Sequence, residues 1–352
     1  MSFSIGIVGL PNVGKSTLFK ALTKQKVDIA PYPFTTINPN IGKVFVPDER
    51  LEKIVKITNP EKITPTTIEF VDIAGLVKGA YRGAGLGNQF LAQIRNCDAI
   101  AEVIRAFEDS RIEHVEKEVN PKRDLEIVEV ELLMKDLETI DKILIKLEKE
   151  VKSGDKEKIK KFDLLKKIKE NLAQGKKISD IPFSEEENRL IEEFQFLTQK
   201  SIVYLFNIGK SNGFNIDESL KLKIGSQFLT ANLKLEEEVS ELSEKEIEEL
   251  NIKPFLDQLI LTCYNVLNLI TFFTIAGGKE VRAWTIKKGA LAPEAGGKVH
   301  SDFEEKFIRA EVIHWQKLVE LNSWKKAREL GLIKTVGRDY VVQDGDIIEF
   351  KI

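Results

Sequence analysis

Residues 9–16 of this 352-residue chain read Gly-Leu-Pro-Asn-Val-Gly-Lys-Ser, which fits the pattern G-x-x-x-x-G-K-[ST]. The apolar run 3–8 before it predicts a buried strand, and residues 17–22 after it predict the start of a helix. A strand, a glycine-bearing loop and a helix N-terminus form an anion site, because backbone N–H groups and the helix dipole converge on phosphates. The pattern therefore predicts an α/β fold that binds a nucleotide.

The loop supplies the predicted phosphate contacts. Its nucleotide-binding residues are Asn12, Val13, Gly14, Lys15, Ser16 and Thr17. Lys15 can reach the β- and γ-phosphates, which makes it a candidate catalytic residue, and the Ser16 hydroxyl can bind Mg²⁺.

Two further segments are predicted to face the same phosphates. The apolar run 68–71 reads as a strand that delivers Asp72 at its end, followed by D-x-x-G. Asp72 can hold a water of the Mg²⁺ shell, and the Gly75 N–H can meet the γ-phosphate. In the segment 33–36, Thr36 is the predicted additional Mg²⁺ ligand, with Thr35 as the alternative.

The predicted base site follows a strand at 201–206 and reads Asn207-Ile208-Gly209-Lys210. A GTPase places Asn-Lys-x-Asp here, and its carboxylate accepts the guanine N1–H and N2–H. Lys210 has donors and no acceptor, so we expect ATP in preference to GTP. Asn207 is predicted to pair with adenine N6 and N7, the Ile208 backbone to line the base, and the loop with Thr230 and Ala231 to complete the pocket.

Composition bounds the class of protein. The chain is 42% hydrophobic and 31% charged with a net charge of −3, which is typical of a globular protein of two or three domains. No apolar stretch has membrane-spanning length, so no membrane partner is expected. Cys97 and Cys263 are the only cysteines, and the N-terminus runs into a strand without a signal peptide. These features favour the cytoplasm, and none of them indicates an oligomeric state.

A long helical segment interrupts the α/β pattern. After Asn120-Pro121, apolar side chains recur in alternating steps of four and three, which predicts a heptad seam. A break at 153–155 and a second helix that stops before Gly175 predict an antiparallel coiled-coil hairpin, inserted at 121–198. Strands resume at 201–207 and 227–231, so the nucleotide-binding domain is expected to span 1–269.

The region 270–352 is predicted to form a separate α+β domain. Residues 270–275 and 281–286 flank a Gly277-Gly278 turn and predict a β-hairpin. A helix at 302–305, a strand-like run at 340–342 and a last strand at 347–352 follow. Trp284 and the basic residues around it are a candidate stacking surface, although a place for Trp284 in the core is the more common outcome.

The chain resembles the YchF/Obg-related family of P-loop ATPases, within the translation-factor class of GTPase-like proteins. The resemblance covers essentially the whole chain and is carried by GLPNVGKST at 9–17, YPFTTI at 32–37, DIAGLVKGA at 72–80 and APEAGGKVHSD at 292–302. It implies ATP hydrolysis, ribosome or RNA binding, and a C-terminal TGS domain of ubiquitin-like β-grasp form. The family usually has Glu where this chain has Lys210, so purine choice depends more on Asn207, Ile208 and residues 230–232.

Two residues are candidates for the hydrolytic step. Leu76 follows Gly75 where Ras-like proteins place a water-orienting Gln, so another group must supply that function. His114, in the polar stretch 108–120, could reach the attacking water if that stretch closes, and the resemblance favours this role over that of an exposed loop histidine. Asn12 could help to hold K⁺ beside the phosphates or could simply cap the loop.

The expected activity is therefore that of an ATP-hydrolysing molecular switch with Mg²⁺ as cofactor. A GTPase of the same architecture is the alternative. A small-molecule kinase would need an acceptor pocket and an Arg-rich lid, which the sequence does not indicate. A non-enzymatic adaptor that binds nucleotide as a structural ligand would release no phosphate.

Overall fold

The computed structural model describes residues 2–24, 40–73, 75, 79, 87–152, 154–210, 216–225, 228–252 and 255–352. The chain forms two compact units. One contains residues 1–43 and 69–256, and the other contains residues 44–68 and 257–352.

The first unit is built on a six-stranded sheet. Its strands in spatial order are β2 (Asn40–Phe45), β4 (Thr67–Asp72), β1 (Ser4–Val8), β5 (Ala99–Arg105), β6 (Ile202–Asn207) and β7 (Phe228–Ala231). β1 pairs in parallel with β4 and β5, and β5, β6 and β7 continue the parallel arrangement. Every residue of β5 is buried, as expected of a central strand covered on both faces. Parallel strands end at one edge, so the loops after β1, β4, β5 and β6 gather there.

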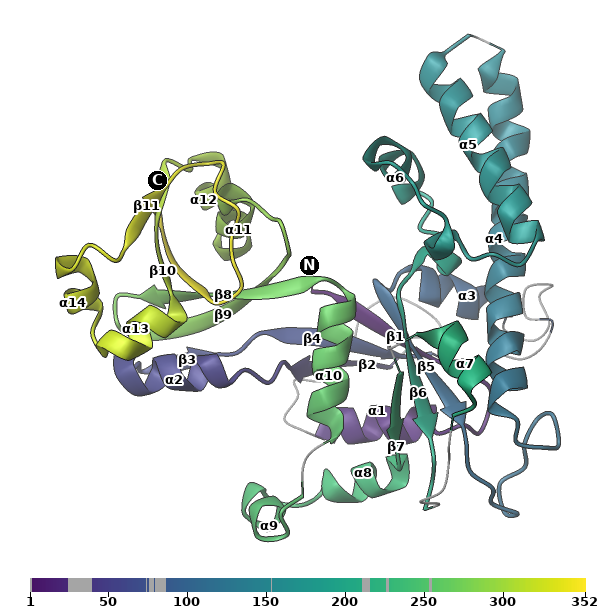
Figure 1. Cartoon of the computed structure of the whole chain (residues 1–352), viewed down its shortest axis with the longest axis horizontal. Coiled ribbons are helices and arrows are strands. Elements are labelled where there is room, and N and C mark those ends of the chain that lie inside the picture. Colours follow the sequence, from purple (N-terminus) through teal and green to yellow (C-terminus); the bar gives the residue numbers. More distant parts are fainter. Residues whose placement is uncertain are drawn as a thin grey trace. The chain divides into compact units, whose positions relative to one another are not determined.

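Helices cover both faces of this sheet (Figure 1). The helices of this unit are α1 (Lys15–Lys24), α3 (Gly87–Arg95), α4 (Pro121–Val151), α5 (Lys156–Ala173), α6 (Glu185–Glu192), α7 (Glu218–Ile224), α8 (Leu233–Val239) and α9 (Glu244–Glu249), with short 3-10 turns η2 (Ile178–Asp180) and η3 (Leu197–Gln199). Of these, α5 and α6 form an apolar cluster with α4 that contains no residue of the sheet. The mixed α/β architecture with a P-loop agrees with the predicted fold class.

The long helix α4 begins where the sequence pattern changes. The Asn120 side chain caps it by accepting the Arg123 N–H at 3.1 Å, and Pro121 occupies the first helical turn. The first turns of α4 belong to the sheet domain, because Leu125 is buried with residues of β5 and β6. Farther along, α4 packs lengthwise against α5 (Figure 1) through buried residues that include Ile140 and Ile168.

The second unit contains another six-stranded sheet. Its order is β11 (Lys334–Val336), β10 (Arg309–His314), β12 (Asp346–Lys351), β8 (Leu269–Ala276), β9 (Glu280–Lys287) and β3 (Lys62–Thr64). The helices α11 (Ala292–Val299) and α12 (Ser301–Glu305) contribute to one apolar cluster. The helices α2 (Glu49–Thr58), α13 (Trp315–Leu321) and α14 (Trp324–Glu329) contribute to another. The helix α10 (Phe255–Val266) precedes β8.

The division into units differs from the single boundary expected at 269/270, because residues 44–68 belong to the second unit. β3 adds to the edge of that sheet in parallel with β9. The apolar face of α2, with Leu51 and Ile54, is buried against Phe273. Arg50 also pairs with Asp344 at 2.7 Å. In each of these contacts the two partners lie more than 200 residues apart in sequence, so local sequence patterns could not predict them.

The C-terminal predictions were confirmed in part. The β-hairpin, the short helix α12 and the last strand form as expected. The strand-like run 340–342 makes only an isolated bridge between Val341 and Leu291. The motif at 292–302 forms α11 and the start of α12, and the sequence pattern did not predict α11.

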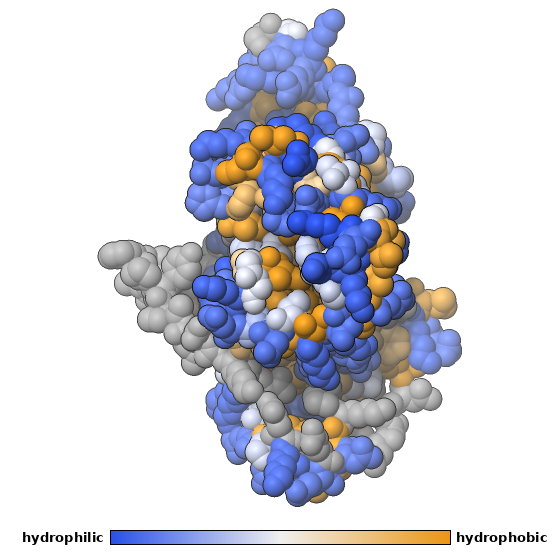
Figure 2. Space-filling model, turned by 90° about the vertical axis from the view of Figure 1, so that its left-hand side faces the viewer, coloured by the Kyte–Doolittle hydropathy of each residue, from blue (hydrophilic) through white to orange (hydrophobic). Residues whose placement is uncertain are grey.

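The face seen in Figure 2 is largely hydrophilic, with apolar side chains in small groups among polar ones. Within the described ranges, we find no helix that combines the length and the hydrophobicity needed for a bilayer crossing.

Candidate functional site

The loop after β1 has the backbone conformation of a phosphate-binding loop. Asn12 has φ 63° and Gly14 has φ 111°, both in the left-handed region. A Cβ at position 14 would lie 2.6 Å from the amide nitrogen of Asn207, so only glycine allows this close approach. α1 starts at the next residue, so its free N–H groups point at the loop.

Lys15 folds back over the loop. Its ammonium donates to the carbonyls of Leu10 at 2.7 Å and Gly9 at 3.2 Å, and the residue is only 8% exposed. Burial lowers the pKa of Lys15 from 10.5 to about 8, and the Asp72 carboxylate opposes that change. A triphosphate can take over the role of these carbonyls, because its anionic oxygens are stronger acceptors.

The predicted Mg²⁺ ligands fit that ion. The Ser16 hydroxyl donates to the Asp72 carboxylate at 3.4 Å, so two oxygen ligands, one from the start of α1 and one from the end of β4, lie together. Burial raises the pKa of Asp72, while Lys15 and Ser16 lower it. Gly75 lies against the P-loop, because an added Cβ would be 3.1 Å from Pro11. Thr36, Thr35 and Leu76 lie outside the described residues.

Asn207 joins the base side of the site to the P-loop. Its amide nitrogen donates to the Val13 carbonyl at 3.0 Å, and its oxygen accepts the N–H groups of Leu233 at 3.3 Å and Gly209 at 3.4 Å. Only one amide N–H stays available for a ligand. That N–H can reach a purine N7, which adenine and guanine share, whereas the engaged oxygen is a poor acceptor for adenine N6.

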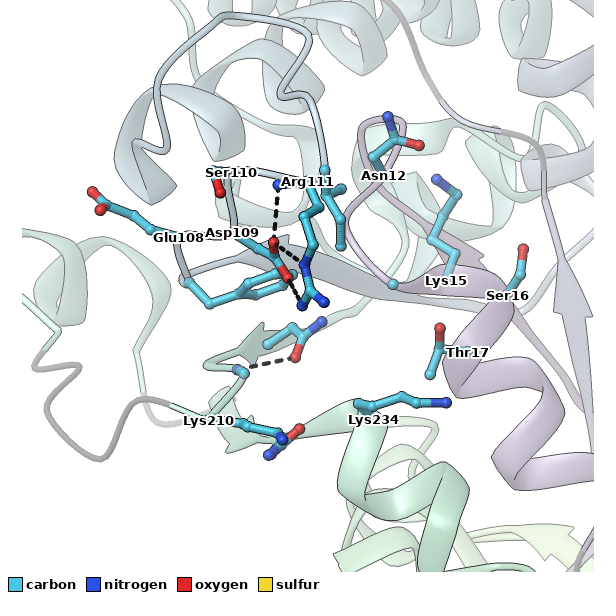
Figure 3. Close-up of a pocket in the computed structure, with 16 residues that line it drawn as sticks. Asn12, Lys15, Ser16, Thr17, Glu108, Asp109, Ser110, Arg111, Lys210 and Lys234 are labelled. Carbon is cyan, nitrogen blue, oxygen red and sulfur yellow. Dashed lines mark hydrogen bonds and ion pairs between the residues drawn. The ribbon is translucent and has the colours of Figure 1, made fainter.

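A pocket of about 910 Å³ opens beside these residues (Figure 3). It is lined by Asn12, Gly14, Lys15, Ser16, Thr17, Phe107, Glu108, Asp109, Ser110, Arg111, Ile112, Asn207, Gly209, Lys210, Asn232 and Lys234. The pocket thus brings together the predicted P-loop residues except Val13 with Asn207, Gly209 and Lys210 of the base segment, and Gly75 does not line it. Ile208, Thr230 and Ala231 are not among its lining residues, but the Ile208 N–H donates to the Ala231 carbonyl at 2.9 Å and so joins the two base loops.

The segment 107–112 forms a wall of the pocket that sequence reasoning missed. Arg105, at the end of β5, is 2% exposed and donates to the carbonyls of Phe107, Asp109 and Ile112 at 3.0, 3.3 and 3.0 Å. Its guanidinium also lies 4.6 Å from the centre of the Phe107 ring. The sequence signal that could have indicated this wall is a basic residue, Arg105, at the end of a buried strand and before a polar loop.

The wall carries both acidic and basic groups. Asp109 accepts two hydrogen bonds from the Arg111 guanidinium, at 3.0 and 2.8 Å, and these bonds lower the pKa of Asp109 to about 2. Both oxygens of Asp109 are therefore engaged. Lys210 and Lys234 line the pocket from the base side, and Figure 3 shows both below Asn12 and Lys15 of the P-loop.

His114 is buried, which contradicts the exposed-loop alternative. Its side chain is 2% exposed, and Nε2 lies 2.9 Å from Oδ2 of Asp124. Nδ1 accepts the N–H of Glu116 at 3.1 Å. The preceding residue is tied to the P-loop, because the amide nitrogen of Asn12 donates to the Glu113 carbonyl at 3.2 Å.

Comparisons with known proteins agree with this fold. A family model described as 50S ribosome-binding GTPase matches residues 4–136, and the model YchF-GTPase_C, a protein of unknown function, matches residues 269–352. The proteins named ribosome-binding ATPase YchF from Bacillus subtilis and Haemophilus influenzae are each 44% identical, with 100% of this chain and 99% of each relative covered. The solved structure of the Schizosaccharomyces pombe YchF GTPase superposes with a TM-score of 0.85 at 38% identity, over 99% of this chain and 98% of that one.

These matches span the nucleotide-binding loop, the helical insertion and the C-terminal sheet together, and the chain therefore belongs to the YchF family.

Proposed function

We propose that this chain is an ATP-hydrolysing molecular switch that associates with ribosomes. The observation that carries the proposal is the joint presence of the P-loop, the Ser16–Asp72 pair and the adjoining pocket in a chain that matches ribosome-binding ATPases along their whole length. The proposal of a ribosome partner comes from the names of those relatives. We place this protein in the cytoplasm, and the composition of the chain supports that location.

The preference for ATP is the finer part of the proposal. Lys210 occupies the position where a GTPase has its guanine-reading carboxylate, and the two oxygens of Asp109 are already paired with Arg111. Glu108 is the other lining carboxylate, and Figure 3 shows its side chain pointing away from Asn12 and Lys15. The pocket thus offers little to accept the guanine N1–H and N2–H. The second candidate is GTP hydrolysis, which the name of the Schizosaccharomyces pombe relative favours.

Hydrolysis is assigned to the following groups. Lys15 binds the β- and γ-phosphates and the Gly75 N–H contacts the γ-phosphate. Ser16, Thr36 and, through a water, Asp72 would hold Mg²⁺, which would supply positive charge beside the phosphates. His114 is proposed to orient or deprotonate the attacking water once it leaves its buried position.

A role for K⁺ at Asn12 is a separate proposal. The amide nitrogen of Asn12 is engaged with Glu113, which supports the loop-tying role, while the amide oxygen is the atom that would face a cation. Turnover in KCl and NaCl at equal ionic strength tests it, and identical rates would reject it.

We propose that residues 270–352 are a TGS domain of β-grasp form and that α4 and α5 form a coiled coil. The order β9-β8-β12-β10, with β8 and β12 parallel, supports the β-grasp assignment. In this domain Arg282 lies 3.8 Å from the centre of the Trp284 ring, and Trp284 packs partly against the core. A nucleic-acid contact at this pair stays a proposal.

Phosphate release with Mg²⁺-ATP, compared between the protein and its Lys15→Ala variant, tests the enzymatic part. Turnover in the wild type and its loss in the variant are expected. Cosedimentation with ribosomes in ADP and in a non-hydrolysable ATP analogue tests the switch, and equal binding in both states would contradict it.

A further inference from the structure

We propose that Asp124 is a positioning residue that holds His114 away from the nucleotide and thereby limits turnover. The inference rests on the proposed catalytic role of His114. It adds a resting state, and it names the contact that must break before hydrolysis.

The bonding of the imidazole defines this resting state. The Glu116 N–H donates to Nδ1, so Nδ1 is unprotonated and the neutral ring carries its proton on Nε2. That Nε2–H points at the Asp124 carboxylate. Both ring nitrogens are engaged and the ring is buried, so neither nitrogen can orient or deprotonate a water.

Asp124 is built to hold the ring firmly. Its side chain is 3% exposed, and its other oxygen accepts the Arg123 guanidinium at 2.9 and 3.2 Å. The residue lies in the first turns of α4, where the helix dipole favours a carboxylate. The bond from His114 is therefore charge-assisted, which makes it stronger than a bond between neutral groups.

The loop is fixed separately at its pocket end. Arg105 holds the carbonyls of residues 107, 109 and 112, and Ile112 still lines the pocket. His114 lies two residues farther on and is not a lining residue. Release from Asp124 can thus free the ring while the wall of the pocket keeps its place.

The opposite role for Asp124 is support of catalysis, as in an Asp–His pair. Such a pair leaves one ring nitrogen open toward the reacting group. Here the second nitrogen is occupied by Glu116, and the ring does not line the pocket. The geometry therefore favours a restraining contact over a supporting one.

Asp124→Asn tests the proposal, because it keeps the size of the side chain and removes its charge. We expect kcat for Mg²⁺-ATP to rise by roughly tenfold, the effect of replacing a charge-assisted bond with a weaker neutral one, with the dissociation constant for ATP unchanged. Asp141→Asn is the matched control. It removes an exposed carboxylate on the same helix, paired with Lys169 at 2.6 Å, and should leave kcat as it is.

His114→Ala and the double variant separate this proposal from the catalytic one. If His114→Ala turns over like the wild type, the catalytic role of His114 fails. If His114→Ala is slow and Asp124→Asn is slower than or equal to the wild type, the catalytic role stands and the restraint is overturned. A rise of kcat in Asp124→Asn that disappears when His114→Ala is added supports the restraint. A rise of kcat that persists in this double variant overturns it.

A spectroscopic readout covers the case in which Asp124→Asn does not fold. The chain has three histidines, so the ring ¹⁵N signals can be assigned with His114→Ala. In the nucleotide-free wild type we expect His114 to be a fixed Nε2–H tautomer with a proton protected from solvent exchange. A ring with averaged tautomers and rapid proton exchange would overturn the proposal.

Discussion

The side-chain amide of Asn207 donates to the backbone carbonyl of Val13 at 3.0 Å and so ties the end of β6 to the phosphate-binding loop. The same amide accepts the N–H of Leu233, the first residue of α8. One side chain therefore sets the spacing between the phosphate side and the base side of the pocket.

Asn207→Ala is expected to weaken nucleotide binding and to destabilise the fold. The substitution leaves the buried carbonyl of Val13 and the N–H of Leu233 without their partner, which costs about 1–3 kcal/mol for each group. Denaturant unfolding and ATP titration measure the two effects. Asn188→Ala, at an exposed position of α6, is the control, and equal behaviour of the two variants would contradict the role of Asn207.

Nucleotide affinity is expected to fall as the pH rises above about 8. Burial lowers the pKa of Lys15 to about 8 in the empty protein, and the phosphates need its charged form, so binding at higher pH requires proton uptake. The loss is at most about tenfold for each pH unit. The unfolded chain holds this proton up to its ordinary pKa of 10.5. The free energy of unfolding of the empty protein should therefore rise as the pH increases from 8 to 10.5.

Titrations at pH 7, 8 and 9 check this dependence. Lys15→Met should bind weakly and without the pH dependence. An affinity of the wild type that stays constant from pH 7 to 9 would contradict the assignment.

Glu102→Gln is expected to stabilise the protein at neutral and alkaline pH. Glu102 lies in β5 and is 2% exposed, and its Oε1 has no partner within the described part of the chain. Burial, with a contribution from Glu129, raises its pKa from 4.5 to about 8. The folded state therefore holds a proton that the unfolded state has lost, and the wild type loses up to about 1.4 kcal/mol for each pH unit between these values.

Urea unfolding at pH 5 and pH 8 measures the difference. The variant should match the wild type near pH 5 and exceed it at pH 8. Glu148→Gln, an exposed position on α4, should change neither value, and an equal gain at both pH values for Glu102→Gln would refute the buried-proton explanation.

Lys210→Asp is expected to move the nucleotide preference toward GTP. The new carboxylate can accept the guanine N1–H and N2–H, so the ratio of ATP to GTP affinity should fall by roughly tenfold or more. Lys234→Asp makes the same charge change at another lining position. If both variants change the ratio alike, the effect is general electrostatics and the specific role of position 210 is wrong.

The parts of this site that follow the chain locally could be predicted from the sequence. The strand 99–105 forms at the predicted residues, and α4 starts at the predicted proline. The P-loop follows from a motif whose spacing fixes its geometry. The Ser16–Asp72 pair follows from the predicted parallel strands, which end at the same edge of the sheet. The roles of individual residues toward the nucleotide remain predictions.

The parts that depend on distant contacts could not be predicted. The wall at 107–112 takes its shape from carbonyls gathered by Arg105, and no spacing rule encodes such a bond. The burial of His114 depends on a carboxylate ten residues away, on another element. Residues 44–68 join the second unit because the apolar face of α2 packs against Phe273 there.

The most direct test of the account is a pair of equilibrium titrations of the intact chain with Mg²⁺-ATP and Mg²⁺-GTP. The account predicts that both bind through Lys15 and that ATP binds about tenfold tighter. Tighter binding of GTP would contradict it.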